Sequence, residues 1–484
     1  MNKLTKGIIG VASVAVIATV TYFGFYSTDD YVKDVEQTMI EKTFYSHLDG
    51  YENTGKMPDI NDATITFGSP RDFNAWSWQK FLHYTEDVKL SDSIVLPRFM
   101  TDMYQVADDG LPVTFKDINQ FIKNGFKYLD NTINNNSNLI VRAHNQAYRG
   151  YEIFSGKGAE ESNLVYYSIH INNIMKKDLD KYNSSDNLRE NPDTRFFSTG
   201  ALEFKIAWAK VSSLDPNIAS KCIKLKAQIL NDDLSIKDDS VELAMIGIHV
   251  VGVAKGHPGF IWSTFEHDAL AYNKVKQEGD NYIVKEGEPT ILDHNATLPK
   301  RVEDRTNYYI REIPYGVDDD VEYKASIIKI NNDVKEKGKN YINSNYFLNG
   351  SIWIKSEYDD NAKESARLMS LPKDKNINTT EFSTGSMLCA NVSMETNAQK
   401  MNCFTCHSTN APRNHGEINY RSMLNFSHLH NNRRVMTKQL IQYTKDQLNK
   451  NKAGVHSEEN KNIPGNIYSQ IYENMKKEIG RAHV

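Results

Sequence analysis

The pattern of apolar and polar positions changes character several times along the chain. Apolar residues run without a charge from Gly7 to Tyr26, which is long enough to span a bilayer. A short helical stretch is predicted from Tyr31 to His47. Aromatic and apolar residues then recur at helical spacing from Phe73 to Leu82, and a further helical pattern covers Val113 to Tyr128. The first half of the chain is therefore expected to supply an anchor and several helices.

The middle of the chain has the pattern of β-strands. Four segments are rich in Val, Ile and aromatic residues and are separated by turn-forming residues: Ile206 to Val211, Ile223 to Leu230, Val241 to Val253 and Phe260 to Leu270. A second β patch is expected near Glu322 to Ile330 and again at Ser351 to Ser356. The pattern predicts a largely antiparallel sheet.

A hairpin is predicted inside this region. Gly256-His257-Pro258-Gly259 is typical of a tight turn and would fold Ile246–Val253 back against Phe260–His267. Side chains alternate along a strand, so one face would carry Trp262, Thr264 and Glu266. The other face would carry Ile261, Ser263, Phe265 and His267.

The flanks of the N-terminal apolar run indicate its orientation. Lys3 and Lys6 precede it, and the acidic Asp29 and Asp30 follow it, so the positive-inside rule places the rest of the chain outside the cytoplasm. Its aromatic end, Tyr22 to Tyr26, lacks the small residues of a cleavage site and favours an uncleaved anchor over a cleaved secretion signal. Cleavage would instead give a secreted protein.

The strongest chemical motif is Cys403-Phe404-Thr405-Cys406-His407. Cys-x-x-Cys-His is the attachment sequence of a covalently bound c-type haem. One helical turn would present both sulfurs to one porphyrin edge while His407 reaches the iron. With 4 Cys and 14 His in 484 residues, chance would give the motif on the order of one time in a thousand. The prediction is one covalent haem c, with Cys403 and Cys406 as thioether anchors and His407 as the metal ligand.

Two other kinds of site share the Cys-x-x-Cys spacing. A zinc knuckle would need a second Cys or His pair at short spacing, and a thioredoxin-like redox pair would need a βαβ context. Neither context is present, because Cys222 and Cys389 each stand alone. These two cysteines could form a disulfide in an oxidising compartment, or each could be a buried thiol.

Covalent haem attachment in bacteria takes place outside the inner membrane, so the motif and the apolar run support each other. A periplasmic protein anchored to the inner membrane is expected. The formal net charge of -5 with 25% charged residues is that of an ordinary surface and does not favour nucleic-acid binding.

The length exceeds what one core usually holds and predicts two domains beyond the anchor. The stretch after Asn431 is mostly polar and has few apolar residues with which to form an independent core. The haem would therefore lie against the larger domain. The predicted fold is α+β: residues 1–27 form the anchor, 28–370 a β-rich antiparallel domain with flanking helices, and 371–484 a mostly helical haem-binding segment with a polar tail.

The sixth iron position is left open by the motif. His267 and Met394 are candidates, and His249 is a further one, although a single His in an apolar strand is more often a hydrogen-bonded core residue. Other Met and His residues lie near the motif: Met387, Met423, Met436, Met475, His415, His428 and His430. A thioether ligand raises the reduction potential, a second His lowers it, and an empty position permits small-molecule chemistry.

Several stretches resemble a widespread group of bacterial monohaem cytochrome c family proteins. The matching stretches are Trp78-Gln79-Lys80-Phe81, Thr199 to Trp208, Gly247 to Val251, Ile261 to His267 and Ala390 to Thr396, followed by the haem motif. The resemblance implies a large domain with a Trp-Ser-Thr-Phe-Glu-His signature before one C-terminal haem. It also implies that the following belong to the family pattern: His249, Glu266, His267, Asn391, Met394 and Glu395. Val392-Ser393 departs from the Thr-Thr often found in that group.

The first hypothesis is a membrane-anchored electron carrier that passes single electrons to a redox partner the sequence does not identify. The alternative is a haem enzyme, peroxidase-like or oxidase-like, with an open iron position. A haem-based sensor is a third possibility, in which ligand binding shifts the fold without turnover.

Overall fold

The computed structural model describes most of the chain between residues 37 and 355 and parts of the C-terminal third. The described residues are 37–124, 127–128, 139–143, 165–181, 197–231, 234–270, 275–278, 281–284, 290–291, 297–299, 321–355, 383–386, 389, 391, 393–395, 403–407, 427–429, 433, 436–437, 439–443, 445–446, 468–471 and 474. The predicted anchor, Gly7 to Tyr26, lies outside them. Among the residues described, no helix is both long and apolar enough to cross a membrane.

In the part of the chain that the structure describes, the helices are α3 (Met39–Thr54), α4 (Pro70–Thr85), α5 (Arg98–Asp102), α6 (Phe115–Lys123), α7 (Asn173–Lys181), α9 (Pro216–Ala219), α10 (Val321–Lys337) and α14 (Cys403–Cys406). Short helical pieces also lie among the described residues between 428 and 474. Capping boxes start the first two: Thr38 with Glu41, and Ser69 with Asp72. Polar side chains placed just before an apolar run therefore fix where these helices begin.

The described strands form one large sheet and two small ones. Their bounds are β1 (Asp87–Ser91), β2 (Ile94–Pro97), β3 (Tyr104–Val106), β4 (Leu139–Ala143), β5 (Tyr166–Ile171), β6 (Leu202–Lys210), β7 (Lys224–Leu230), β8 (Ile236–Ala254), β9 (His257–His267), β10 (Val275–Glu278), β11 (Asn281–Val284), β12 (Thr297–Pro299), β13 (Tyr346–Ile354) and β14 (Ser383–Gly385). The large sheet has the order β14-β13-β9-β8-β6-β5-β4-β7, with β3 beside β5. Its pairings are antiparallel except for β4 with β7.

Strand β8 is long enough to pair with different strands along its two halves. Its second half pairs with β6 and β9, and its first half pairs with β7. Because β7 also pairs with β4, the strands β8, β6, β5, β4 and β7 form a closed ring of hydrogen-bonded neighbours. This end of the sheet therefore curls, while β9, β13 and β14 extend it as an open side.

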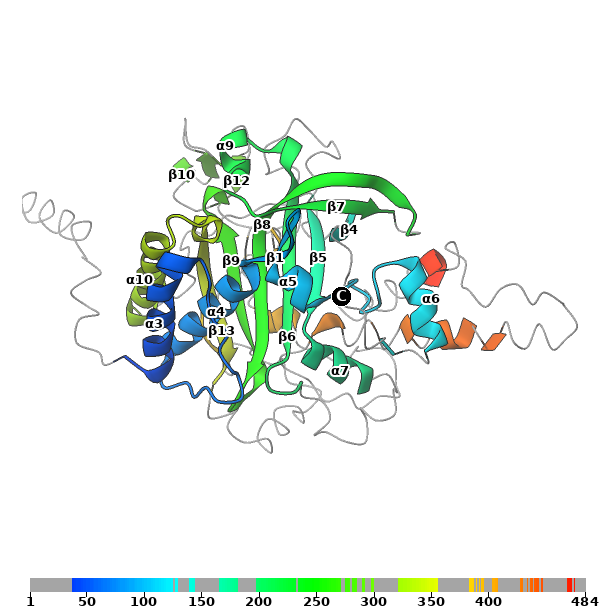
Figure 1. Cartoon of the computed structure of the whole chain (residues 1–484), viewed down its shortest axis with the longest axis horizontal. Coiled ribbons are helices and arrows are strands. Elements are labelled where there is room, and N and C mark those ends of the chain that lie inside the picture. Colours follow the sequence, from blue (N-terminus) through cyan, green and yellow to red (C-terminus); the bar gives the residue numbers. More distant parts are fainter. Residues whose placement is uncertain are drawn as a thin grey trace, which may run out of the picture.

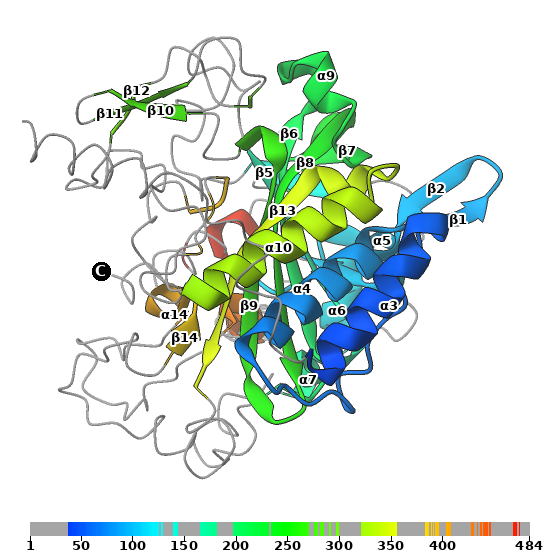
Figure 2. The same cartoon turned by 90° about the vertical axis from the view of Figure 1, so that its left-hand side faces the viewer.

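The two faces of the sheet are covered by different parts of the chain (Figures 1 and 2). Helices α3, α4 and α10 form a layer on one face, and the described C-terminal pieces, orange and red, lie on the other. Helix α4 lies between the sheet and the other two helices, so it is buried almost all round. The N-terminal and C-terminal parts of the chain thus meet opposite sides of one sheet.

The helix layer shows how the two close tryptophans of the predicted helix are used. Trp76 donates from Nε1 to Asp62 at 2.7 Å, and Trp78 donates to Asn331 at 2.9 Å. Both side chains are fully buried in the core between helices and sheet. Both tryptophans therefore pack in this core and hold neighbouring segments through their indole N–H groups.

Three of the fold predictions are confirmed. The structure is α+β with a β-rich antiparallel sheet, the helix over Phe73–Leu82 lies inside α4, and the hairpin is formed by β8 and β9. The turn falls two residues earlier than expected, at Lys255-Gly256, where Gly256 has φ +76°. Ala254 pairs directly with His257, so the strand begins inside the segment predicted as a loop.

One predicted strand is wrong. Glu322 to Ile330 belongs to helix α10, which buries Tyr323, Ile327, Ile330 and Val334 at helical spacing against α4. The local run of β-branched residues suggested a strand, but the helical period over the whole segment decides the structure. The patch at Ser351–Ser356 is confirmed in part, since β13 ends at Ile354.

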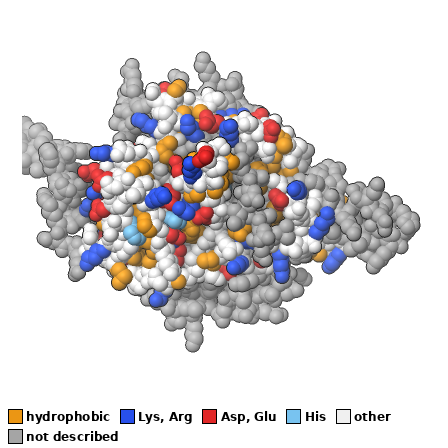
Figure 3. Space-filling model, in the orientation of Figure 1, with side chains coloured by type: hydrophobic (Ala, Val, Ile, Leu, Met, Phe, Trp, Pro, Cys, Tyr) orange, Lys and Arg blue, Asp and Glu red, His pale blue; other side chains and the backbone are white. Residues whose placement is uncertain are grey.

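Charges of both signs are mixed on the described surface seen in Figure 3, where Lys and Arg stand beside Asp and Glu over the same elements. This mixture agrees with the small net charge of the chain. It offers no extended basic patch on that face for a polyanion.

Candidate functional site

The Cys-x-x-Cys-His motif forms a turn of helix. Helix α14 spans Cys403–Cys406, and the backbone N–H of His407 donates to the Cys403 carbonyl at 2.8 Å. Phe404, 1% exposed, enters the hydrophobic cluster on the sheet face away from α4. The buried Phe404 therefore fixes the turn to the sheet while Cys403 and His407 stay partly exposed. The Cys406 side chain lies outside what the structure describes.

The imidazole of His407 contacts two other rings. Its centroid lies 4.0 Å from the ring of Trp262 on β9 and 4.4 Å from the ring of His428. The interplanar angles are 37° and 40°. Trp262 belongs to the Trp-Ser-Thr-Phe-Glu-His segment, so the two parts of the sequence that stood out meet here.

His428 is held by its two neighbours. The hydroxyl of Ser427 donates to a carboxylate oxygen of Glu203 on β6 at 2.7 Å, and Leu429 is 1% exposed in the same hydrophobic cluster as Phe404. The backbone on both sides of His428 is thereby fixed to the sheet. Its ring is presented toward His407 by this anchoring.

A row of polar residues crosses the same face of the sheet. Lys205 on β6 is paired with His249 on β8, which is paired with Thr264 on β9. Thr264 is two residues from Trp262 and so lies on the same face. His249 and Trp262 are diagonal neighbours across the two strands, a separation of roughly 7–8 Å. The polar row therefore adjoins the ring that contacts His407.

His249 is closed in by a turn from the C-terminal third. Its Nε2 lies 2.8 Å from Oε1 of Glu395, and its Nδ1 lies 2.9 Å from the Thr264 hydroxyl. A carboxylate only accepts, so Nε2 carries hydrogen and donates to Glu395. The backbone N–H of Asn391 also donates to Glu395, at 3.0 Å. Burial opposes ionisation of Glu395, but His249 and this N–H outweigh it and lower its pKa.

A glycine admits that turn to the sheet. A Cβ at Gly247 would meet the Ser393 hydroxyl well inside contact distance and Asn391 Nδ2 at 3.3 Å. The turn is also held by Tyr167, whose hydroxyl donates to the Ser393 carbonyl at 2.8 Å. The small residue at 247 thus lets the Asn391–Glu395 turn reach His249.

The charged groups around the row titrate away from their ordinary values. Burial raises the pKa of Glu203, against the opposing effects of Ser427 and Lys205. Burial lowers the pKa of Lys205, against the attraction of Glu395, Asp108 and Glu203. A half-buried lysine beside buried carboxylates is the kind of cluster that catalytic and binding sites use, and also that structural ion networks use.

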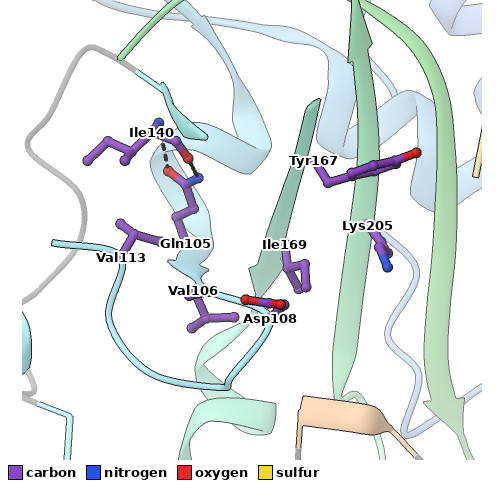
Figure 4. A pocket seen from close by; sticks show the side chains of 9 residues that line it. Gln105, Val106, Asp108, Val113, Ile140, Tyr167, Ile169 and Lys205 are labelled. Atoms are coloured by element: carbon purple, nitrogen blue, oxygen red, sulfur yellow. Dashed lines mark hydrogen bonds between the residues drawn. The ribbon is translucent and has the colours of Figure 1, made fainter. Parts of the chain in front are cut away.

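A small cavity of about 30 Å³ opens to solvent beside Lys205. Lys205 and Tyr167 line one side, and Gln105 and Val113 line the opposite side (Figure 4). Gln105 is fixed by hydrogen bonds to the backbone N–H and carbonyl of Ile140. Most of the remaining wall is apolar, so the cavity is an apolar pocket with Lys205 at its edge.

His267, a predicted sixth ligand, is placed away from the motif. It lies on the face of β9 that also carries Phe265, which packs on Trp78 and Phe81 of α4. Its Nε2 lies 3.2 Å from the Lys221 carbonyl, and its Nδ1 accepts from the Ala269 N–H at 3.1 Å. Burial lowers its pKa to about 4. With both ring nitrogens engaged, it serves as a structural core residue in this arrangement.

Met394, the other predicted ligand, is fully buried but in a different cluster from the motif. It packs with Ile246, Leu270 and Ile291, whereas Cys403 and Phe404 pack with Trp262 and Leu429. Its backbone N–H donates to Asn391 at 2.6 Å. The structure thus brings neither His267 nor Met394 to His407.

The remaining cysteines are not joined to each other. Cys222 is buried and donates to the Ile218 carbonyl at 3.3 Å. Cys389 is buried in the cluster that holds the motif, and its sulfur is 3.6 Å from that of Cys403. Of the two options left open for Cys222 and Cys389, the disulfide between them is not found.

Comparison with known proteins gave no matching family model, no matching curated protein and no matching solved structure.

The residue types at the motif are those that would hold a covalent haem, namely the thiols of Cys403 and Cys406 and the imidazole of His407. One helical turn carries Cys403 and His407. His428, whose ring centroid lies 4.4 Å from that of His407, is a second imidazole beside the residues that would hold a haem.

Proposed function

We propose that this protein is a c-type cytochrome that carries one covalent haem at Cys403, Cys406 and His407 and transfers single electrons. The observation that carries the proposal is the helical turn of the motif, docked on the sheet with His407 against Trp262. A haem bound there would supply one-electron redox chemistry. The resemblance to bacterial monohaem cytochromes c supports the same proposal.

The residues of this chain have distinct roles in it. Cys403 and Cys406 hold the porphyrin edge, and His407 is the proximal ligand. Trp262 provides a flat apolar surface beside the ligand and excludes water from that side, because it is 5% exposed. His428 is the first candidate for the sixth position, since it is the other imidazole in contact with His407.

The location belongs to the proposal as well. The apolar run Gly7–Tyr26 would hold the protein in the inner membrane with its haem on the periplasmic side. Its redox partner would meet it there, and nucleic acid has no part in the function.

The test is expression of the full chain with haem-maturation machinery, followed by denaturing electrophoresis with haem staining and by absorption spectra. Covalent haem in the wild type, and its loss in Cys403→Ala/Cys406→Ala, are expected. Haem that stays covalently attached without both cysteines would refute the proposal, as would failure of the wild type to take up haem.

The same spectra assign the sixth ligand. His428→Ala is expected to convert a six-coordinate low-spin spectrum to a high-spin one that responds to carbon monoxide. His267→Gln and Met394→Leu are the matched controls and should leave the spectrum unchanged. A change in either control, with none in His428→Ala, would move the assignment away from His428.

A second candidate function, a haem enzyme of peroxidase-like or oxidase-like type, is favoured by one observation. The half-buried His249–Glu395 pair lies over the sheet face that carries Thr264 and Trp262, and a positioned imidazole-carboxylate pair can accept and return a proton. A high-spin wild-type spectrum with peroxide turnover that falls at least tenfold in His249→Gln would favour the enzyme. A low-spin spectrum unaffected by carbon monoxide would exclude it.

A further inference from the structure

The strongest feature outside the proposed ligand set is a pair of sulfurs. Cys389 Sγ lies 3.6 Å from Cys403 Sγ. Thirteen residues lie between the two cysteines in the sequence, and Cys389 is not part of the haem motif. A disulfide needs its sulfurs at about 2.05 Å, so a closing movement of about 1.5 Å would join them.

The two sulfurs are held by separate parts of the fold. Upstream of Cys389, β14 pairs with β13, and the Ser386 N–H donates to the Ser351 carbonyl at 2.7 Å. A Cβ at Gly350 would collide with Ser386, so this glycine lets the segment lie flat on β13. Cys403 is held by the buried Phe404 beside it. The approach of the sulfurs is therefore a property of the packed sheet face.

We propose that Cys389 is a disulfide partner of Cys403 in the haem-free protein, and that this bond protects Cys403 and withholds it from haem until it is reduced. The disulfide itself does not depend on the proposed haem function. Only its consequence for haem attachment rests on that function.

The exposures of the two cysteines set the order of the chemistry. Cys403 is partly exposed and Cys389 is buried, so an external protein disulfide reaches Cys403 first. The Cys403 thiolate attacks that disulfide, forms a mixed disulfide and displaces one thiolate of the oxidant. Cys389 then attacks the Cys403 sulfur and displaces the second. Two protons pass to the two departing sulfurs, so the oxidant becomes a dithiol and this protein gains one disulfide.

The sequence makes the bond simple to detect. Lys400 lies between the two cysteines, whereas no Lys or Arg lies between Cys403 and Cys406. After trypsin, a Cys389–Cys403 bond links two peptides, while a Cys403–Cys406 bond stays inside one.

The experiment is non-reducing peptide mapping by mass spectrometry of the full chain, exported without haem-maturation machinery and alkylated at purification. The linked pair is expected as the main disulfide species, and it should disappear in Cys389→Ser. Cys222→Ser is the matched control, since that thiol lies in another cluster, and should keep the linked pair. Only the internal Cys403–Cys406 bond, or reduced cysteines throughout, would overturn the proposal.

The consequence is tested by haem loading. With maturation machinery but limiting reductant, Cys389→Ser should take up at least twofold more covalent haem than the wild type, and excess reductant should abolish the difference. Equal loading under limiting reductant would overturn the protective role. If no haem attaches even to fully reduced wild type, the haem function fails while the peptide map still decides the disulfide.

Discussion

At the scale of single residues, the haem motif could be found from the sequence because its chemistry is local. The residues that surround it could not. His428 has no distinctive sequence context, and its approach to His407 depends on Ser427 reaching Glu203, more than two hundred residues away in the chain. The alternation in β9 was predicted and is confirmed, and it already separates Trp262 from His267.

Glu395 should make a pH-dependent contribution to stability. Its folded-state pKa lies below its ordinary value of 4.5, so its stabilisation is present above pH 4.5 and is lost as the pH falls through the folded-state value. Glu395→Gln should lower the free energy of unfolding at pH 7 by roughly 1–3 kcal/mol. Denaturant unfolding at pH 7 and at stepwise lower pH measures this difference, which should shrink as acid is added. A difference that stays constant would show that the charge of Glu395 is not responsible.

His267 should have an acid response over a different range. Burial holds its pKa at about 4 against an ordinary 6.5, so the unfolded chain binds the proton more tightly. The contribution of neutral His267 to the free energy of unfolding is fully present above pH 6.5. It falls by about 3 kcal/mol as the pH drops toward 4. His267→Gln should be less stable than the wild type at pH 7. It should also lose less stability than the wild type between pH 6.5 and 4. Denaturant unfolding at each pH measures the stability of both proteins. An equal loss of stability in the wild type and the variant would contradict a buried neutral His267.

At the scale of elements, local signals were sufficient where a segment has one clear period. Helix α4 and the β8–β9 hairpin were predicted for this reason. The β-branched residues of α10 locally favour a strand, whereas its contacts with α4 follow the helical period and decide the structure. Pairings between distant segments, such as β13 with β14 and the turn over Gly247, carry no local signal and depend on long-range packing.

Gly247 offers a test of how the Asn391–Glu395 turn docks on β8. In Gly247→Ala the new methyl would press on Ser393 and displace the turn, at a cost of roughly 1–3 kcal/mol. Amide hydrogen exchange of peptides over the turn should also increase. Gly50→Ala is the matched control, because nothing lies within 4 Å of its Cβ position in α3 and alanine favours a helix by about 1 kcal/mol. Equal stability changes in the two variants would show that the turn does not rest on Gly247.

At the scale of the whole molecule, the large domain and the C-terminal segment share one core. Apolar side chains from both sides of residue 371 pack in the same cluster: Val251, Phe260, Trp262, Ile352, Phe404, Leu429, Met436 and Leu440. Composition after Asn431 already indicated that this segment lacks a core of its own. The sheet face that this segment covers is decided by tertiary packing. Arg433 pairs with Asp180, and the Tyr468 hydroxyl donates to Asp109.

Removal of residues 371–484 should therefore leave the large domain incomplete. Each buried apolar side chain that loses its cover forfeits roughly 1.5–3 kcal/mol of burial, and the exposed face would bind other apolar surfaces. A chain of residues 28–370 is expected to aggregate, or to bind a hydrophobic dye strongly, in size-exclusion chromatography and fluorescence assays. The matched control is a chain of residues 28–484, which keeps the cover and should elute as a defined species. If the shorter chain is monodisperse and unfolds at the same denaturant concentration as the longer one, the sheet face does not need the C-terminal segment, and the haem motif would have to be stabilised by other contacts.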